Sequence, residues 1–223
     1  MLIIASLCNS VIDLTEKDEN TIEKVVKLLE DGLFDVAIEE LHSFLKTRPD
    51  SIEGWYNLGY ALTEKGEYDA AIRAYDEALA IDNGIFALWF NKGTTLYEQM
   101  DFEKARECYE KALEIDPNDP EAWNNLGNCF SRLANGRAAI EAYTRAVALK
   151  PDYAEAFYNK ANAHFIEEED ERAIAYAEVA IQLDPKLAER VDQWINVSRN
   201  RLISKRDQEE HERRVRERSK QKD

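Results

Sequence analysis

Four asparagines recur at intervals of 34 residues along the chain, at Asn57, Asn91, Asn125 and Asn159. The carboxamide of asparagine offers both hydrogen-bond donors and an acceptor. It can therefore pair with a peptide unit whatever side chain that unit carries. We interpret these four residues, the asparagine row, as suited to binding an extended polypeptide backbone. Further amides close to the row are Asn124, Asn128 and Asn162.

Acidic and aromatic side chains flank the asparagine row. The acidic ones are Glu53, Glu64, Glu98, Glu121 and Glu155, and the aromatic ones are Tyr56, Tyr60, Phe90, Tyr97 and Tyr158. Carboxylates beside aromatic rings favour lysine and arginine, through ion pairs and cation–π contacts. The pattern thus indicates a peptide partner that is neutral to basic. The alternative, a solvated acidic rim that only keeps the protein in solution, stays open.

The residues that most often perform catalysis do not form a recognisable set. His42, His164 and His211 lie far apart in the sequence. No HExxH motif, phosphate-binding glycine loop or dinucleotide fingerprint occurs. The acidic run at residues 167–171 lacks the ligand spacing of a calcium loop. We therefore expect no catalytic residues, no metal and no cofactor, and we predict that the protein is not an enzyme.

Cysteine usage and the N-terminal stretch bear on where the protein works. Cys8, Cys108 and Cys129 show no paired spacing for a disulfide or zinc site, which favours a reducing compartment. Residues 1–14 lack a basic leader, and their apolar run is broken by Ser6, so a secretory signal or membrane span is disfavoured. We expect a flexible or amphipathic lead-in that packs on the first repeat of a cytoplasmic protein.

Charge is distributed unevenly along the chain, whose net charge is −16. Residues 1–185 hold 17 basic and 37 acidic groups, a balance of −20. Residues 186–223 hold 12 basic and 8 acidic groups, a balance of +4. The negative part repels phosphate, so we expect it to bind neither nucleic acid nor an anionic membrane. Basic partners are attracted to it, and more weakly as the salt concentration rises.

A wider pattern with the same period places these side chains on helices. Trp55, Trp89 and Trp123 keep the 34-residue interval, with Phe157 next. A period of this length is typical of stacked supersecondary units. Within residues 120–153, apolar and small residues recur every three or four positions on both sides of a short turn. Each unit is therefore expected to be a helical hairpin.

Gly59, Gly93 and Gly127 share the period and fall inside the first helix of each hairpin. A helical glycine costs about 1 kcal/mol relative to alanine, so a packing reason is needed. Small residues also occupy the matching positions of the second helices: Ala71, Ala105, Ala139 and Ala173. We expect glycine facing alanine to bring the two helix axes close together, with the tryptophans filling the wider space toward the next helix.

The recurring pattern Trp-x-x-Leu-Gly, followed by Ala, Tyr, Ala and Pro, resembles the tetratricopeptide repeat. It is complete in Trp123, Leu126, Gly127, Phe130, Ala139, Tyr143, Ala146 and Pro151. Lys92 replaces the leucine in one copy, and His164 stands at an aromatic position in another. The resemblance implies an all-α fold, a right-handed superhelical solenoid of antiparallel helix pairs. It also implies that the first helices line a concave groove that binds peptides or protein segments.

The repeats divide the chain into segments. The lead-in covers residues 1–17, and a divergent first repeat covers 18–51. The next four repeats cover 52–85, 86–119, 120–153 and 154–187. A capping helix is expected at 188–204, covering the open face of the last repeat, and a charged helix or tail at 205–223.

One family partner is disfavoured by the groove residues. Family members that bind the acidic C-terminus of heat-shock chaperones use two lysines and one arginine on the first helices. The equivalent positions here include Glu53, Tyr56, Phe90, Glu121 and Asn124. We therefore expect a protein or peptide partner of another kind. Because asparagine is common in the family at the row's position, family background remains an alternative explanation of the row.

The predicted function is that of a non-catalytic adaptor or scaffold, which binds an extended, neutral to basic segment in the groove. The alternative is a structural or self-assembling protein whose terminal repeats or basic tail join copies. Residues 211–222 carry six basic and two acidic groups, which suits contact with RNA, with anionic lipid or with the acidic groove of another copy. We expect a monomer or a weak homo-oligomer.

Overall fold

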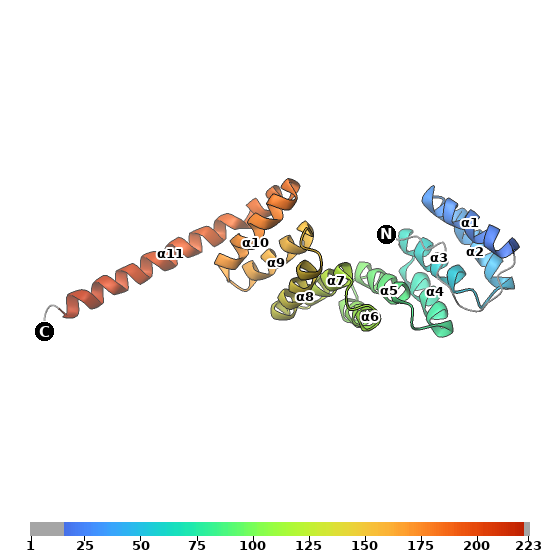
Figure 1. The fold of residues 1–223 in the computed structure, drawn as a ribbon, viewed down its shortest axis with the longest axis horizontal. Coiled ribbons are helices and arrows are strands. Elements are labelled where there is room, and N and C mark those ends of the chain that lie inside the picture. The colour runs from blue at the N-terminus through green and yellow to red at the C-terminus, as the bar shows by residue number, and fades with distance from the viewer. Residues whose placement is uncertain (1–15, 221–223) are drawn as a thin grey trace. The chain divides into compact units, whose positions relative to one another are not determined.

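The computed structural model describes residues 16–220, which form helices joined by short connections (Figure 1). The expected lead-in falls almost entirely on residues 1–15, outside the described part. The helix pairs are α1 (Glu16–Glu30) with α2 (Phe34–Thr47), α3 (Ile52–Glu64) with α4 (Tyr68–Ile81), α5 (Phe86–Glu98) with α6 (Phe102–Ile115), α7 (Pro120–Arg132) with α8 (Gly136–Leu149), and α9 (Ala154–Ile166) with α10 (Asp170–Leu183). The short 3-10 helix η1 (Pro185–Leu187) and α11 (Ala188–Lys220) follow. The predicted all-α fold of tandem helix pairs is confirmed.

The helices form two compact units. Unit 1 contains α1 to α6 and ends at Asn118, and unit 2 begins at Asp119 and contains α7 to α11. In each unit the helices of a pair pack together, and the second helix also packs on the first helix of the next pair. First helices touch as well: α3 contacts α1 and α5 in unit 1, and α7 contacts α9 in unit 2. We call the surface made by these first helices the first-helix face of each unit.

One residue in the turn inside each pair has a positive φ angle. These residues are Gly32 (71°), Gly66 (76°), Met100 (67°), Ala134 (56°) and Glu168 (58°). The next residue donates its backbone N–H to a carbonyl five residues earlier, as Asp101 does to Leu96 at 2.9 Å. A left-handed residue closing a helix in this way is most often glycine. In the last three pairs a side chain is held there at a cost of about 1–2 kcal/mol.

The helical glycines make room for a tyrosine ring, which corrects the expectation that they face alanine. A Cβ atom on Gly59 would lie 2.7 Å from Cε1 of Tyr75, and one on Gly127 would lie 2.5 Å from Cε1 of Tyr143. Each ring is buried and comes from the second helix of the same pair. Ala71 is buried too but is not among the nearest neighbours of Gly59. The close approach is therefore between the tyrosine ring of the second helix and the glycine backbone of the first helix.

Two half-buried tryptophans, Trp55 and Trp89, each link their own helix pair to the connection that precedes it. The Nε1 atom of Trp55 donates to the carbonyl oxygen of Pro49, and that of Trp89 to the carbonyl oxygen of Asn83, both at 2.8 Å. Both rings also pack against the core of unit 1. Because every residue type has a backbone carbonyl, Asn83 can accept this hydrogen bond at the position where the other repeats have proline.

The first turns of α11 cover the open side of the last pair. Val191 and Trp194 are buried, and the Trp194 ring stacks on Phe165 with the ring centres 4.9 Å apart. Further along α11, the Nη2 atom of Arg201 lies 2.7 Å from Oδ1 of Asp170, the first residue of α10. An apolar contact and an ion pair thus hold α11 on α9 and α10.

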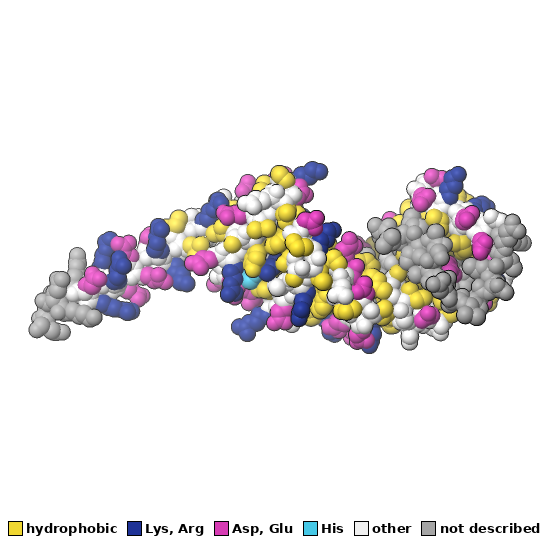
Figure 2. Space-filling view, viewed as in Figure 1, with side chains coloured by type: hydrophobic (Ala, Val, Ile, Leu, Met, Phe, Trp, Pro, Cys, Tyr) yellow, Lys and Arg dark blue, Asp and Glu magenta, His cyan; other side chains and the backbone are white. Residues whose placement is uncertain are grey.

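Charged side chains dominate the rest of α11. Glu210 pairs with Arg214 at 2.5 Å and Glu212 with Arg216 at 3.2 Å, each four residues apart. Figure 2 shows basic and acidic side chains alternating along this stretch. Such exposed pairs add only about 0.2–0.5 kcal/mol each to helix stability. Among the described helices, none combines the length and the apolar character needed to cross a membrane.

Candidate peptide-binding surface

The predicted site residues lie on the first helices of four pairs. Asn57 and Asn91 stand on α3 and α5 in unit 1, and Asn125 and Asn159 on α7 and α9 in unit 2. The asparagine row therefore consists of two halves, each held by its own unit. Its use as one continuous row stays a prediction.

Asn91 joins α5 to α3 within unit 1. Its Nδ2 atom donates to the hydroxyl of Tyr56 at 3.1 Å and to the carbonyl oxygen of Ala87 at 2.8 Å. Tyr56 is only 1% exposed, and burial raises its pKa to about 12 although the bond from Asn91 opposes the rise. Both amide hydrogens of Asn91 are thus used inside the protein, and its oxygen is the atom left to accept from a ligand.

The start of α3 carries two buried polar side chains. Ser51 caps the helix by accepting from the backbone N–H of Gly54 at 3.1 Å. Its Oγ atom lies 3.5 Å from Oε2 of Glu53, which is 7% exposed. Asn57, one turn later, is 0% exposed, and neither its Nδ2 nor its Oδ1 atom has a hydrogen-bond partner. These two predicted contact residues are therefore covered in this state of the protein.

The rest of the predicted site in unit 1 is more open. Three aromatic side chains are half-buried: Tyr60, Phe90 and Tyr97. The ring of Phe90 packs edge-on against Tyr109, with the centres 5.7 Å apart. Burial, followed by the nearby carboxylate of Glu64, raises the pKa of Tyr60. Glu64 and Glu98 are exposed at the C-terminal ends of α3 and α5.

Amide side chains bond to one another in unit 2. Asn159 donates from Nδ2 to Oδ1 of Asn124 at 3.0 Å and of Asn128 at 3.3 Å, which joins α9 to α7. The hydroxyl of Tyr143 also donates to Oδ1 of Asn128, at 2.8 Å. Asn124 reaches Oδ1 of Asn125 at 3.4 Å. Part of the amide cluster thus holds helices together, and the half-buried Asn125 is its most peripheral member.

An arginine of the chain itself occupies the acidic and aromatic position of α9. The Nη1 atom of Arg190, on α11, lies 2.9 Å from Oε2 of Glu155. Its guanidinium carbon lies 3.9 Å from the ring centre of Tyr158. Glu121 and Asn162, the other predicted residues of unit 2, are exposed and half-buried respectively. Glu155 and Tyr158 thus bind an arginine of the same chain, whereas the sequence analysis expected them to bind a basic residue of a partner.

Sequence reasoning missed Arg190 because it follows the last repeat and has no counterpart in the 34-residue pattern. The available signal was its place in the predicted capping helix, which must lie against α9 and α10. A basic residue early in that helix can reach the first-helix face. Burial of the apolar side of α11 then decides where the arginine goes.

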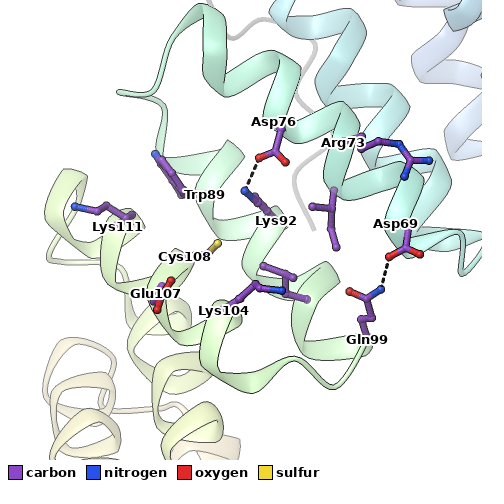
Figure 3. A pocket seen from close by; sticks show the side chains of 12 residues that line it. Asp69, Arg73, Asp76, Trp89, Lys92, Gln99, Lys104, Glu107, Cys108 and Lys111 are labelled. Carbon is purple, nitrogen blue, oxygen red and sulfur yellow. Dashed lines mark hydrogen bonds and ion pairs between the residues drawn. The ribbon is translucent and has the colours of Figure 1, made fainter.

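A separate cavity of about 530 Å³ lies among α4, α5 and α6 in unit 1 (Figure 3). Lys92, at the family's leucine position, pairs there with Asp76 at 2.5 Å and lies 5.6 Å from the Trp89 ring centre. Across the cavity, Gln99 donates to Asp69 at 2.6 Å. These two pairs cross from one repeat to the next, and the cavity contains none of the predicted site residues.

The most chemically distinctive group in unit 2 surrounds His164. Its Nδ1 atom lies 2.8 Å from Oε2 of Glu169, and its ring stacks on Tyr176 with the centres 5.3 Å apart. The Nζ atom of Lys160, itself buried, lies 4.0 Å from the Tyr176 ring centre. Burial lowers the pKa of His164 against the opposing effect of Glu169. Within the described residues, no cluster of His, Cys, Asp and Glu is arranged to hold a metal ion.

Family comparisons agree with the repeat pattern and the helix pairs. Models described as tetratricopeptide repeats match residues 24–84, 120–153 and 154–187, and one described as a TPR repeat matches 93–133. The chain belongs to the tetratricopeptide repeat family. Proteins of this family generally mediate protein–protein interactions. None of the curated proteins compared with the chain matches it.

Solved structures of the family share the fold at low sequence identity. A crystal structure of MamA is 21% identical, covers 80% of this chain and 99% of its own, and has a TM-score of 0.69. MamA 41-end from Desulfovibrio magneticus RS-1 is 20% identical, with 77% and 97% covered and a TM-score of 0.72. YrrB, described as a TPR protein with an unusual peptide-binding site, is 22% identical, with 78% and 90% covered and a TM-score of 0.68.

Proposed function

We propose that this protein is a non-catalytic adaptor whose first-helix faces bind extended protein segments that are neutral to basic. One observation carries the basic preference: Glu155 and Tyr158 already bind the guanidinium of Arg190 by an ion pair and a cation–π contact. An external lysine or arginine can form the same kind of ion pair with exposed carboxylates of the face, such as Glu121, and a cation–π contact with its half-buried rings, such as Tyr60.

Two further properties support this proposal. The balance of −20 over residues 1–185 attracts basic segments and speeds their association at low salt. The amide oxygen of Asn91 and the half-buried amide of Asn125 can pair with peptide groups. The similarity to YrrB, a TPR protein with a peptide-binding site, agrees with such a role. Cys108 and Cys129 are buried thiols that form no disulfide, which suits a reducing cytoplasm, and we propose that the protein works there.

Fluorescence anisotropy with three labelled peptides of matched length tests the proposal. One peptide carries arginines, one carries no charge and one carries aspartates in the same positions. We expect affinity to fall in that order and the arginine peptide to bind more weakly as salt rises. Glu98→Gln with Glu121→Gln should weaken the arginine peptide, because both carboxylates are exposed on the first-helix face.

The matched control exchanges two exposed glutamates of second helices, Glu77→Gln with Glu141→Gln, which removes the same charge elsewhere. If both double variants weaken binding equally, net charge rather than the first-helix face attracts the peptide. Equal binding of the arginine and aspartate peptides contradicts the proposal outright.

Self-association is the second candidate, because α11 exposes apolar side chains beside its charges. Val197 and Ile203 are each 48% exposed on this helix. A second copy could cover them while the basic end of α11 meets an acidic surface. Sedimentation velocity of the wild type and of Ile203→Asp tests this. A concentration-dependent dimer that the variant abolishes supports self-association, and a monomer at all concentrations rules it out.

A further inference from the structure

The cavity among α4, α5 and α6 combines an apolar floor with a charged rim. Leu96 and Cys108 form the floor and are 2% and 5% exposed. Ile72 and Trp89 are half-buried beside them. Burial raises the pKa of the Cys108 thiol to about 11, although the charge of Lys92 opposes the rise. The thiol therefore stays neutral and acts as a small apolar group, so the floor favours a ligand with an apolar part.

The small side chain of Cys108 keeps this space open. Tyr176 holds the same position two repeats later, on α10 in unit 2. There its ring stacks on His164, and the ring centre lies 4.0 Å from the Nζ atom of Lys160, both counterparts of cavity residues. Cysteine has no such ring, and about 530 Å³ is left in unit 1. This volume is within the usual range of ligand sites, about 300–1,000 Å³.

Two departures from the repeat pattern bring positive charge to the rim. Arg73 stands at a position where other second helices carry glutamate, namely Glu39, Glu107 and Glu141. Lys92 stands where α3 and α7 carry leucine. Together with two lysines of α6, four basic and three acidic residues line the cavity. Over residues 1–185, by contrast, there are 37 acidic and 17 basic groups, so the balance of charge reverses at the cavity.

Among the described side chains of the rim, Arg73 is the cation left free to bind a ligand. It is exposed, and it forms no hydrogen bond or ion pair with the residues that the structure describes. The three lysines each pair with a carboxylate of the chain: Lys92 with Asp76 at 2.5 Å, Lys104 with Asp101 at 2.7 Å and Lys111 with Glu114 at 2.8 Å. A guanidinium can hold a carboxylate by two parallel hydrogen bonds. The rim therefore favours a ligand that carries a carboxylate.

The cavity continues into a second hollow along α4. This hollow, of about 310 Å³, shares Asp69, Arg73 and Gln99 with the cavity and extends to Gly66 in the turn between α3 and α4. Figure 3 shows Trp89 and Arg73 on opposite sides of the cavity. The apolar and the cationic parts are thus separated along an elongated surface. Such a surface suits an extended protein segment better than a compact small molecule.

We propose that the cavity and the hollow form a second binding site, which takes an acidic protein segment. An aromatic side chain of the segment packs on the floor beside Trp89, and a neighbouring carboxylate pairs with Arg73. The site contains none of the residues proposed to bind basic segments, so it does not depend on the proposed function. One consequence does rest on that function: an adaptor with both sites joins a basic segment to an acidic one.

Fluorescence anisotropy of the full-length protein with a short labelled peptide, one phenylalanine between aspartates, tests the site. One control peptide has serine in place of the phenylalanine, and the other has asparagines in place of the aspartates. We expect the serine peptide to bind at least about tenfold more weakly, because the contact with the floor is lost. The asparagine peptide should bind at least about fivefold more weakly, because the ion pair is lost. The proposal is overturned if either control binds as tightly as the phenylalanine peptide.

Arg73→Glu tests the place of binding, because it gives this position the residue type of other second helices. We expect it to weaken the phenylalanine peptide at least about fivefold. The matched control Arg145→Glu makes the same change of charge at an exposed residue of α8 in unit 2, and should alter binding less than about twofold. An equal loss in both variants shows that net charge attracts the peptide, which overturns the site.

Filling the cavity gives a second variant, Cys108→Tyr, which copies the residue of unit 2. Provided that circular dichroism shows a folded protein, it should weaken the phenylalanine peptide at least as much as Arg73→Glu does. A folded variant that binds this peptide normally overturns the proposal. If the variant does not fold, Arg73→Glu with its control decides.

The arginine peptide separates this proposal from the adaptor function. Arg73→Glu should not weaken the arginine peptide, because the first-helix face is unchanged. Binding of the phenylalanine peptide that depends on Arg73, without any binding of the arginine peptide, supports the second site and contradicts the adaptor function. Binding of the arginine peptide, with no effect of Arg73→Glu on the phenylalanine peptide, overturns the second site and leaves the adaptor function intact.

Discussion

The guanidinium carbon of Arg190 lies 3.9 Å from the ring centre of Tyr158, which joins α11 to the first-helix face of unit 2. The ion pair with Glu155 holds the same guanidinium from the side, and both of its members are nearly half exposed. Exposed ion pairs contribute little, about 0–1 kcal/mol. The arginine is therefore held weakly enough for a cation of a partner to replace it.

Replacing Arg190 by alanine should tighten binding of the arginine peptide. The change frees Glu155 and Tyr158, and the gain should not exceed about fivefold, equivalent to ~1 kcal/mol. The free energy of unfolding should fall by no more than a similar amount. Fluorescence anisotropy and urea denaturation measure the two effects.

Arg199→Ala is the control, because Arg199 is exposed on the same helix. It removes one positive charge without touching the cation position of α9. A gain in peptide affinity that is the same for both variants shows that only net charge matters. A loss of affinity in Arg190→Ala shows that the peptide depends on the α11 contact instead of competing with it.

Two asparagines at equivalent positions should differ in their effect on stability. Asn91→Ala removes the hydrogen bonds to Tyr56 and Ala87, and should lower the free energy of unfolding by about 1–3 kcal/mol. Asn57→Ala removes no bond to the described residues and should cost clearly less. Urea denaturation followed by circular dichroism compares the two. Equal losses mean that packing rather than hydrogen bonding sets the cost.

These two residues also show what the sequence could predict and what it could not. The 34-residue period correctly predicts the helix pairs, because burial of one helix face requires a repeated spacing. It places Asn57 and Asn91 at the same position of successive helices. Their surroundings differ because the hydrogen-bond partners come from neighbouring helices. The residue type at the position of Tyr56, which binds Asn91, is not the same in every repeat. Position in a repeat thus predicts the element and leaves the partners of each side chain undetermined.

The turn residues with positive φ angles offer a stabilising change. Ala134→Gly should raise the free energy of unfolding by about 1 kcal/mol, because glycine adopts the left-handed conformation without a steric cost. Ala134 is exposed, so little packing is lost. The converse change, Gly66→Ala at φ 76°, should destabilise by a similar amount. Urea midpoints measure both, and the same sign for the two changes contradicts this explanation.

Alanine at the helical glycines should destabilise according to the space available. A Cβ atom at position 127 would lie 2.5 Å from the Tyr143 ring, whereas one at 93 would have 3.1 Å to Tyr109. Gly127→Ala should therefore cost about 1–3 kcal/mol, because the buried ring must move. Gly93→Ala should cost less, since its helix propensity gain offsets part of the strain. Thermal unfolding of the two variants gives the order, and the reverse order contradicts the ring-to-backbone explanation.

Stability should fall when the solution becomes mildly acidic, because of His164. Burial lowers the pKa of this imidazole below its ordinary value of 6.5, and Lys160 and Arg172 act in the same direction against Glu169. The unfolded chain then takes up a proton at higher pH than the folded protein does. The free energy of unfolding is therefore highest above pH 6.5 and decreases as pH falls toward the lower, folded pKa.

Thermal unfolding between pH 7.5 and 5.5 tests the effect of His164. We expect the transition temperature of the wild type to fall over this range, and His164→Phe to reduce the fall because an uncharged ring still stacks on Tyr176. His42→Gln is the matched control, since that histidine is exposed on α2. The explanation fails if His42→Gln reduces the pH dependence as much as His164→Phe, because a buried neutral imidazole would then not be its source.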